Sequence, residues 1–129
     1  MPTPTTPLSI SEVADHTGLT VATLRYYERA GLMLAPIHRG SSTHREYSAE
    51  DVAWIVFLTK LRSTALPIAR VRDYAELARQ GDSSRADRLE LLQRHRITVA
   101  GQLESMRTSL DAIDYKISLY SESERLSPA

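Results

Sequence analysis

The chain has 129 residues, equal numbers of basic and acidic side chains, and no cysteine. The lack of cysteine excludes disulfides, thiolate metal sites and cysteine nucleophiles, and no apolar run is long enough to span a membrane. The first residues also lack the pattern of a secretory signal, so we expect a cytoplasmic protein, and the length suits one domain or a small domain plus an extension.

Charge is distributed unevenly along this neutral chain. Residues 1–72 carry eight basic and six acidic side chains, whereas residues 73–129 carry eight and ten. Residues 25–45 hold one acid, Glu28, and four arginines, which are Arg25, Arg29, Arg39 and Arg45. A local basic patch of this kind is typical of proteins that bind a polyanion.

Two short helices are predicted at the start. Ser9 and Glu12 form a capping-box pattern, and Gly18 suits the left-handed position that ends a helix. Thr20 can cap a second helix, which Gly31 then stops. The pattern of two short helices joined by a glycine-containing turn predicts a helix-turn-helix.

The second helix carries the segment TVATLRYYERAGL, which has two readings. On a 3.6-residue period Val21 and Leu24 face inward, and Arg25 and Tyr27 lie at the borders. The outward positions are Ala22, Thr23, Tyr26 and Arg29. This face suits the major groove of DNA, but both tyrosines could equally be packing residues.

A small hairpin is predicted over residues 36–48, with turn residues at 40–43. Basic and aromatic residues flank its tip, namely His38, Arg39, His44, Arg45 and Tyr47. After a helix-turn-helix, such a hairpin indicates a wing that lies along DNA, although a solvated loop is the alternative.

Three more helices follow in the pattern. Residues 49–64 form an apolar helix that begins at a Ser48 cap, residues 67–80 form another, and Gly81 breaks the chain. A long helix is predicted from about residue 84 to about residue 122, and about 35 residues of helix would be roughly 52 Å long.

The long helix carries an apolar heptad seam that a single small domain cannot cover. Its members are spaced 4,3,4,3,4,3 and are Val99, Leu103, Met106, Leu110, Ile113, Ile117 and Tyr120. The seam predicts dimerisation with a second copy, the alternative being a helix that folds back on its own domain.

Sites for chemistry are not evident in the sequence. The four histidines have no helical partner histidine, and there is no phosphate-binding glycine loop or nucleophile motif. We therefore expect no enzyme, no catalytic residue, no metal site and no cofactor.

The segments ISEVADHTGLTVATLRYYERAGLMLAPIHR and HREYSAEDVAWI strongly resemble the MerR family of bacterial transcriptional regulators. TLRYYERAGL matches the recognition-helix signature of the family, and HREYS matches the end of its wing. The resemblance implies a mainly α fold, with a winged helix-turn-helix head and a long antiparallel coiled-coil dimerisation helix. It also implies a homodimer on a palindromic operator, where bending and underwinding of the promoter spacer lets RNA polymerase use both promoter elements.

The resemblance assigns roles to positions that match the family pattern. The implied DNA-binding residues are Thr20, Thr23, Arg25, Tyr26, Tyr27, Arg39, His44, Arg45 and Arg62. The domains expected are a disordered tail (1–8), the DNA-binding head (9–81), the dimerisation helix (82–121) and a flexible tail (122–129). An interaction module whose head does not read DNA is the alternative function.

The sequence departs from the family pattern in three places. Thr43 stands where the wing usually has glycine, and Ala65 replaces the glycine of the usual TGM between the later helices. Cysteine-based sensing is impossible, so any small-molecule effector is unknown. Four aromatic residues could line a ligand site or could belong to the core and seam, namely Trp54, Tyr74, Tyr115 and Tyr120.

Overall fold

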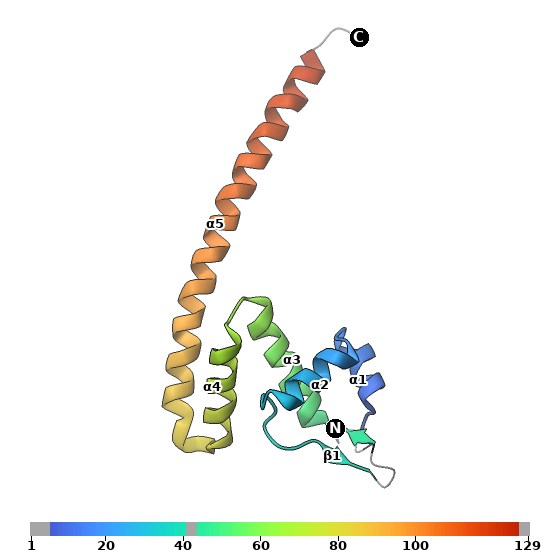
Figure 1. Ribbon diagram of the computed structural model, residues 1–129. Coiled ribbons are helices and arrows are strands. Elements are labelled where there is room, and N and C mark those ends of the chain that lie inside the picture. The colour runs from blue at the N-terminus through green and yellow to red at the C-terminus, as the bar shows by residue number, and fades with distance from the viewer. Residues whose placement is uncertain (1–5, 41–43, 127–129) are drawn as a thin grey trace. The chain divides into compact units, whose positions relative to one another are not determined.

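The computed structural model describes residues 6–40 and 44–126, and within them the chain is mainly helical (Figure 1). Helices precede and follow one two-stranded antiparallel sheet, in the order α1, α2, β1, β2, α3, α4, η1, α5. This order confirms the predicted fold class of a winged helix-turn-helix followed by a long helix.

Helices α1 (Ile10–Thr17) and α2 (Val21–Arg29) form the helix-turn-helix. The capping box of α1 is complete, because Ser9 N donates to Glu12 Oε1 at 3.0 Å and Glu12 N donates to Ser9 Oγ at 3.2 Å. Gly18 ends α1 with a φ of +76°. The next helix starts three residues later, which fixes the sharp turn between the two.

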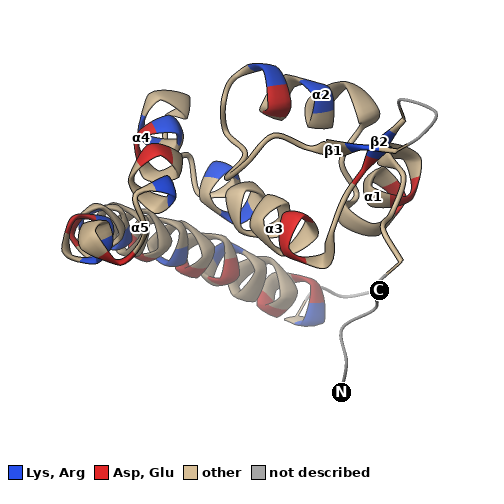
Figure 2. Ribbon diagram, turned by 90° about the horizontal axis from the view of Figure 1, so that it is seen from below, with Lys and Arg blue, Asp and Glu red and all other residues tan. Residues whose placement is uncertain are grey.

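The hairpin consists of strands β1 (His38–Arg39) and β2 (Arg45–Glu46). His38 pairs with Glu46 and Arg39 with Arg45. In both views the hairpin lies at the same end of the head as α1 (Figure 1, Figure 2). The predicted departure at Thr43 lies outside the described residues.

The prediction that residues 1–8 form a disordered tail is wrong at Leu8. Its backbone forms a bridge with Tyr47, with N···O distances of 2.9 and 2.8 Å. The bridge forms because the Tyr47 backbone, one residue past β2, still offers an amide and a carbonyl to an extended neighbour. Leu8 therefore belongs to the head.

Helix α3 (Ala49–Ser63) packs against α1, and helix α4 (Ile68–Arg79) packs against α3. The core of the head is apolar and includes Val13, Leu24, Ile55, Leu58 and Val71, all at most 2% exposed. In the turn between α3 and α4, Ala65 has a φ of +69°. The position does require positive φ, so the missing glycine is a strained departure from the family pattern rather than a neutral one.

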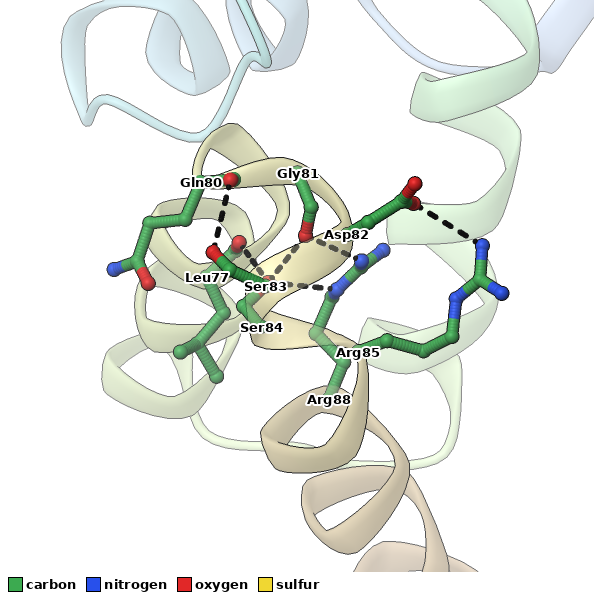
Figure 3. Close-up of polar contacts among 8 residues, drawn as sticks. All are labelled: Leu77, Gln80, Gly81, Asp82, Ser83, Ser84, Arg85 and Arg88. Atoms are coloured by element: carbon green, nitrogen blue, oxygen red, sulfur yellow. Dashed lines mark hydrogen bonds and ion pairs between the residues drawn. The ribbon is translucent and has the colours of Figure 1, made fainter.

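A buried serine joins α4 to α5 through the 3₁₀ turn η1 (Gly81–Ser84) (Figure 3). The Ser84 hydroxyl donates to the Leu77 carbonyl and lies 3.0 Å from the Gly81 carbonyl. Arg88 donates from Nε to Ser84 Oγ at 3.0 Å and from Nη2 to the Gly81 carbonyl at 2.8 Å. These bonds satisfy the backbone of the corner where the chain reverses direction.

Helix α5 (Arg85–Leu126) has 42 residues and no buried side chain in the single chain. It continues past the predicted end at residue 121, because no proline or glycine intervenes and Arg125 pairs with Glu122 at 3.3 Å. The chain divides into two compact units, residues 1–91 and 92–129, and the division lies within α5. No described helix is long and apolar enough to cross a membrane.

Candidate nucleic-acid interface

Helix α2 presents a basic face to solvent. Arg25 and Arg29 are exposed, and Tyr26 is 42% exposed between them. Among the described residues Arg25 has no ion-pair partner, so its guanidinium is available to a phosphate or a base. Tyr26 and Arg29 lie outward as the helical period predicts, and Arg25, predicted at the border of this face, is exposed as well.

Tyr27 does not lie on this face. Only 5% of it is exposed, and with Leu24 it forms the buried side of α2. Its neighbour Tyr26 is tilted by 55° to it, with ring centroids 6.4 Å apart. Each of the two interpretations therefore holds for one tyrosine. Tyr26 is exposed on the face that could meet DNA, and Tyr27 is a packing residue.

Thr20 and Thr23 open the recognition helix. Thr20 Oγ1 accepts from the Thr23 amide at 3.0 Å and donates to Thr23 Oγ1 at 2.9 Å. The Thr20 hydroxyl thus caps α2 and sets the start of the helix, and the Thr23 hydroxyl is held against it.

The wing arginines meet an acid on α2. Arg45 Nε lies 2.5 Å from Glu28 Oε2, and Arg39 Nη2 lies 3.6 Å from Glu28 Oε1. The sequence pattern marked Glu28 only as the one acid in a basic stretch, and its contact with both strands was missed. Partners seventeen residues apart show no periodicity that a sequence could reveal.

The rest of the wing is anchored by Tyr47, which is 1% exposed. Its hydroxyl is the one buried side-chain polar atom without a hydrogen bond in the described part of the chain. Burial, and then the nearby Glu28 charge, raise the pKa of Tyr47, so the ring stays neutral. His44 is exposed near the tip, and Gly40 N donates to its carbonyl at 2.9 Å.

Arginine side chains of α3 and α4 donate hydrogen bonds to backbone carbonyls of the head. Arg62 is exposed and donates to the Leu66 carbonyl at 2.7 Å, which leaves a partly committed guanidinium for the predicted phosphate contact. Arg79 donates to the carbonyls of Met33 and Gly31, and Arg72 donates to Ala30 at 3.2 Å. These bonds hold the segment that follows the recognition helix.

Two of the four aromatic residues considered for a ligand site, Trp54 and Tyr74, contact each other in the head. Trp54 and Tyr74 stack with centroids 5.7 Å apart, and Trp54 Nε1 donates to the Leu32 carbonyl at 2.8 Å. Tyr115 and Tyr120 are exposed on the second unit. Trp54 and Tyr74 are therefore packing residues of the head.

Lysine and arginine positions, drawn in blue, occur on α2 and on both hairpin strands (Figure 2). The contacts of Glu28 with Arg39 and Arg45 show that these elements adjoin. The recognition helix and the wing are therefore adjacent, and their exposed arginine and tyrosine side chains are suited to phosphates and base edges.

Comparison with known proteins identifies the class. Residues 8–77 match the model of the MerR HTH family of regulatory proteins, and the chain belongs to this family. It is a DNA-binding transcriptional regulator.

Particular relatives agree with this assignment. The HTH-type transcriptional regulator AdhR of Bacillus subtilis is 41% identical over 85 residues, which are 66% of this chain and 60% of AdhR. This match spans less than two thirds of the relative's length. An HTH-type transcriptional regulator from Haemophilus influenzae is 27% identical over 90% of this chain and 85% of its own.

Solved structures extend the likeness through the long helix. A Listeria monocytogenes protein assigned to the MerR family has a TM-score of 0.82 and 39% identity, over 88% of this chain and 86% of its own. HiNmlR, a MerR family regulator that lacks the sensor domain and was solved bound to promoter DNA, has a TM-score of 0.81 and 26% identity. That similarity covers 93% of this chain and 94% of HiNmlR.

Proposed function

We propose that this regulator binds a palindromic promoter operator as a homodimer, with α2 in the major groove and the wing along the backbone. The observation that carries the proposal is the open basic face of α2 beside a wing, in a chain whose long helix leaves its apolar seam uncovered. The bound HiNmlR structure supports the DNA partner by similarity.

The exposed seam supports the dimer. Six of its seven members are more than half exposed in the single chain, namely Leu103, Met106, Leu110, Ile113, Ile117 and Tyr120. Val99, the seventh, is half-buried. A continuous apolar stripe of this length marks an interaction surface, and a second copy offers the same stripe.

The charges beside the seam favour an antiparallel pair. Arg107 and Asp114 both follow a seam residue directly and flank Leu110, the middle member of the seam, from three residues before it and four residues after it. Antiparallel pairing therefore brings Arg107 next to Asp114 of the partner subunit, twice by symmetry. Parallel pairing would set Ser109 against Asp114 and Gln102 against Arg107, with no opposite charges in contact.

Two heads held by one coiled coil would grip two half-sites at a fixed separation. Such a dimer can bend and underwind the promoter spacer, so that RNA polymerase reaches both promoter elements. The proposed site of action is the cytoplasm, where bacterial promoters lie. Any small-molecule effector is left unassigned.

Selection from a randomised duplex library tests this proposal. The protein should enrich a palindromic sequence, and its affinity for that duplex should fall about 10³-fold or more between 50 and 200 mM salt. Failure to enrich any sequence would overturn the proposal.

Arg25→Ala tests the open face directly. We expect it to weaken binding to the selected duplex by at least about tenfold, because Arg25 has no structural ion pair to lose. Arg94→Ala, on α5 outside the seam, is the control. Equal small effects of the two variants would exclude α2 as the reading helix.

A further inference from the structure

An acid sits inside the surface proposed to bind DNA. Glu28 is the one acidic residue between positions 25 and 45, and it lies on α2 directly before the exposed Arg29. A carboxylate at this place repels phosphates, because like charges at close range cost free energy. Simple electrostatics therefore predicts that its removal strengthens DNA binding.

The geometry of Glu28 indicates a different role. Its two carboxylate oxygens reach one arginine on each strand of the wing, Oε2 toward Arg45 at 2.5 Å and Oε1 toward Arg39 at 3.6 Å. The two arginines are cross-strand partners in the hairpin. One side chain of the recognition helix thus contacts both strands.

The contact with Arg45 is shielded from solvent. The Glu28 and Arg45 side chains are 23% and 22% exposed, whereas Arg39 is 47% exposed. A charge-assisted hydrogen bond that is partly withdrawn from water is stronger and less screened by salt than an exposed pair. Arg45 is therefore the firmer of the two connections.

The wing needs such a connection. Each strand has two residues, and an isolated two-stranded hairpin is at best marginally stable in water. The backbone bridge between Leu8 and Tyr47 joins the base of the wing to the N-terminal segment, whereas the contacts of Glu28 join both strands to α2.

We propose that Glu28 is a positioning residue that locks the wing to the recognition helix, so that both meet the DNA as one rigid surface. The inference rests on the proposed DNA-binding role of this surface. It assigns to the one acid of the basic patch a favourable effect on DNA binding, opposite in sign to its charge.

Two variants separate positioning from repulsion. Glu28→Gln removes the charge, and Glu28→Asp keeps the charge but shortens the side chain so that it withdraws from Arg45. Positioning predicts that both bind the selected duplex about tenfold more weakly, because wing contacts with phosphates are lost. Repulsion predicts tighter binding for Glu28→Gln and no change for Glu28→Asp.

The salt dependence of binding supplies a readout that a merely structural role does not move. If wing contacts are lost, the slope of log affinity against log salt becomes shallower by about 1–2. Thermal unfolding of each variant gives the folded fraction, to which the affinities are corrected. Corrected affinities and slopes equal to those of the wild type would overturn the proposal.

Matched variants locate the effect at the Arg45 contact. Glu46→Gln removes an acid from the same wing, where Glu46 pairs only with His38 at 3.6 Å among the described contacts, and it should not weaken binding. In an Arg45→Met background, Glu28→Gln should cause little further loss, because the contact is already broken. Full additivity of the two changes would contradict positioning through Arg45.

Binding by the wild type separates a failure of the proposed DNA-binding function from a failure of the positioning role of Glu28. If it enriches no duplex, the proposed function fails and the role of Glu28 fails with it. If it binds a selected duplex and Glu28→Gln binds more tightly, the DNA-binding function stands and only the positioning role is excluded.

Discussion

At single positions of the head, the fold determines whether a side chain is buried and which backbone angle a residue adopts. Tyr26 and Tyr27 are adjacent and chemically identical, yet one faces solvent and the other lies in the core. Ala65 adopts the left-handed conformation that L-residues avoid. Both features depend on the exact path of the backbone.

Ala65→Gly should stabilise the protein. Relief of the positive φ gains about 1–2 kcal/mol, and the greater freedom of glycine in the unfolded chain offsets part of this, so we expect a net gain of about 0.5–1 kcal/mol. Chemical denaturation measures the change. The opposite change at a like angle is the control, because Gly18→Ala meets no atom within 4 Å and should cost about 1 kcal/mol through φ alone.

The elements of the head are joined by side chains that bond to backbone carbonyls. Arg79 holds the carbonyls that follow α2, Arg62 bridges α3 to the start of α4, and Ser84 closes the corner between α4 and α5 (Figure 3). Such bonds satisfy the carbonyls that helices leave open at their ends. They link the recognition helix to the first turns of α5 through packed, bonded contacts.

Ser84→Ala should destabilise the corner by about 1–2 kcal/mol. The change removes the bond from the Ser84 hydroxyl to the part-buried Leu77 carbonyl and the bond that the Arg88 guanidinium makes to Ser84. Urea unfolding checks the value. Ser83→Ala is the matched control, since its hydroxyl is exposed and bonds to Gln80 at 3.3 Å, and a loss as large as that of Ser84→Ala would contradict this account.

At the scale of the whole molecule, the exposed apolar seam of α5 bears on the oligomeric state. The single chain of 14.5 kDa leaves the apolar stripe of α5 exposed to water. Proteins seldom expose such a stripe without a partner. In the proposed homodimer, the orientation of the second copy decides how far apart the two heads lie, and hence which operator they fit.

A charge exchange tests the antiparallel pairing. Arg107→Asp and Asp114→Arg should each weaken the homodimer by about 2 kcal/mol, because each sets two like-charged pairs against one another. Mixed together, the two variants should form a heterodimer, in which every pair is again opposite in charge. Native mass spectrometry measures the species present, and a statistical mixture would contradict the antiparallel arrangement.

The sequence by itself determined the features that depend on neighbours along the chain. The caps at Ser9 and Ser48, the stop at Gly18 and the period of the seam are local, because hydrogen bonds and helical faces connect residues three or four apart. These features sufficed for the fold class, and the segment around Arg25 sufficed for the family.

Tertiary structure alone decided which of the predicted residues meet. It buried Tyr27, joined Leu8 to Tyr47, set Ala65 at positive φ and placed Glu28 between the two wing arginines. Such contacts depend on how the helices pack and where the chain turns in space. No spacing in the sequence encodes them, because partners that are distant along the chain are brought together only when the core closes.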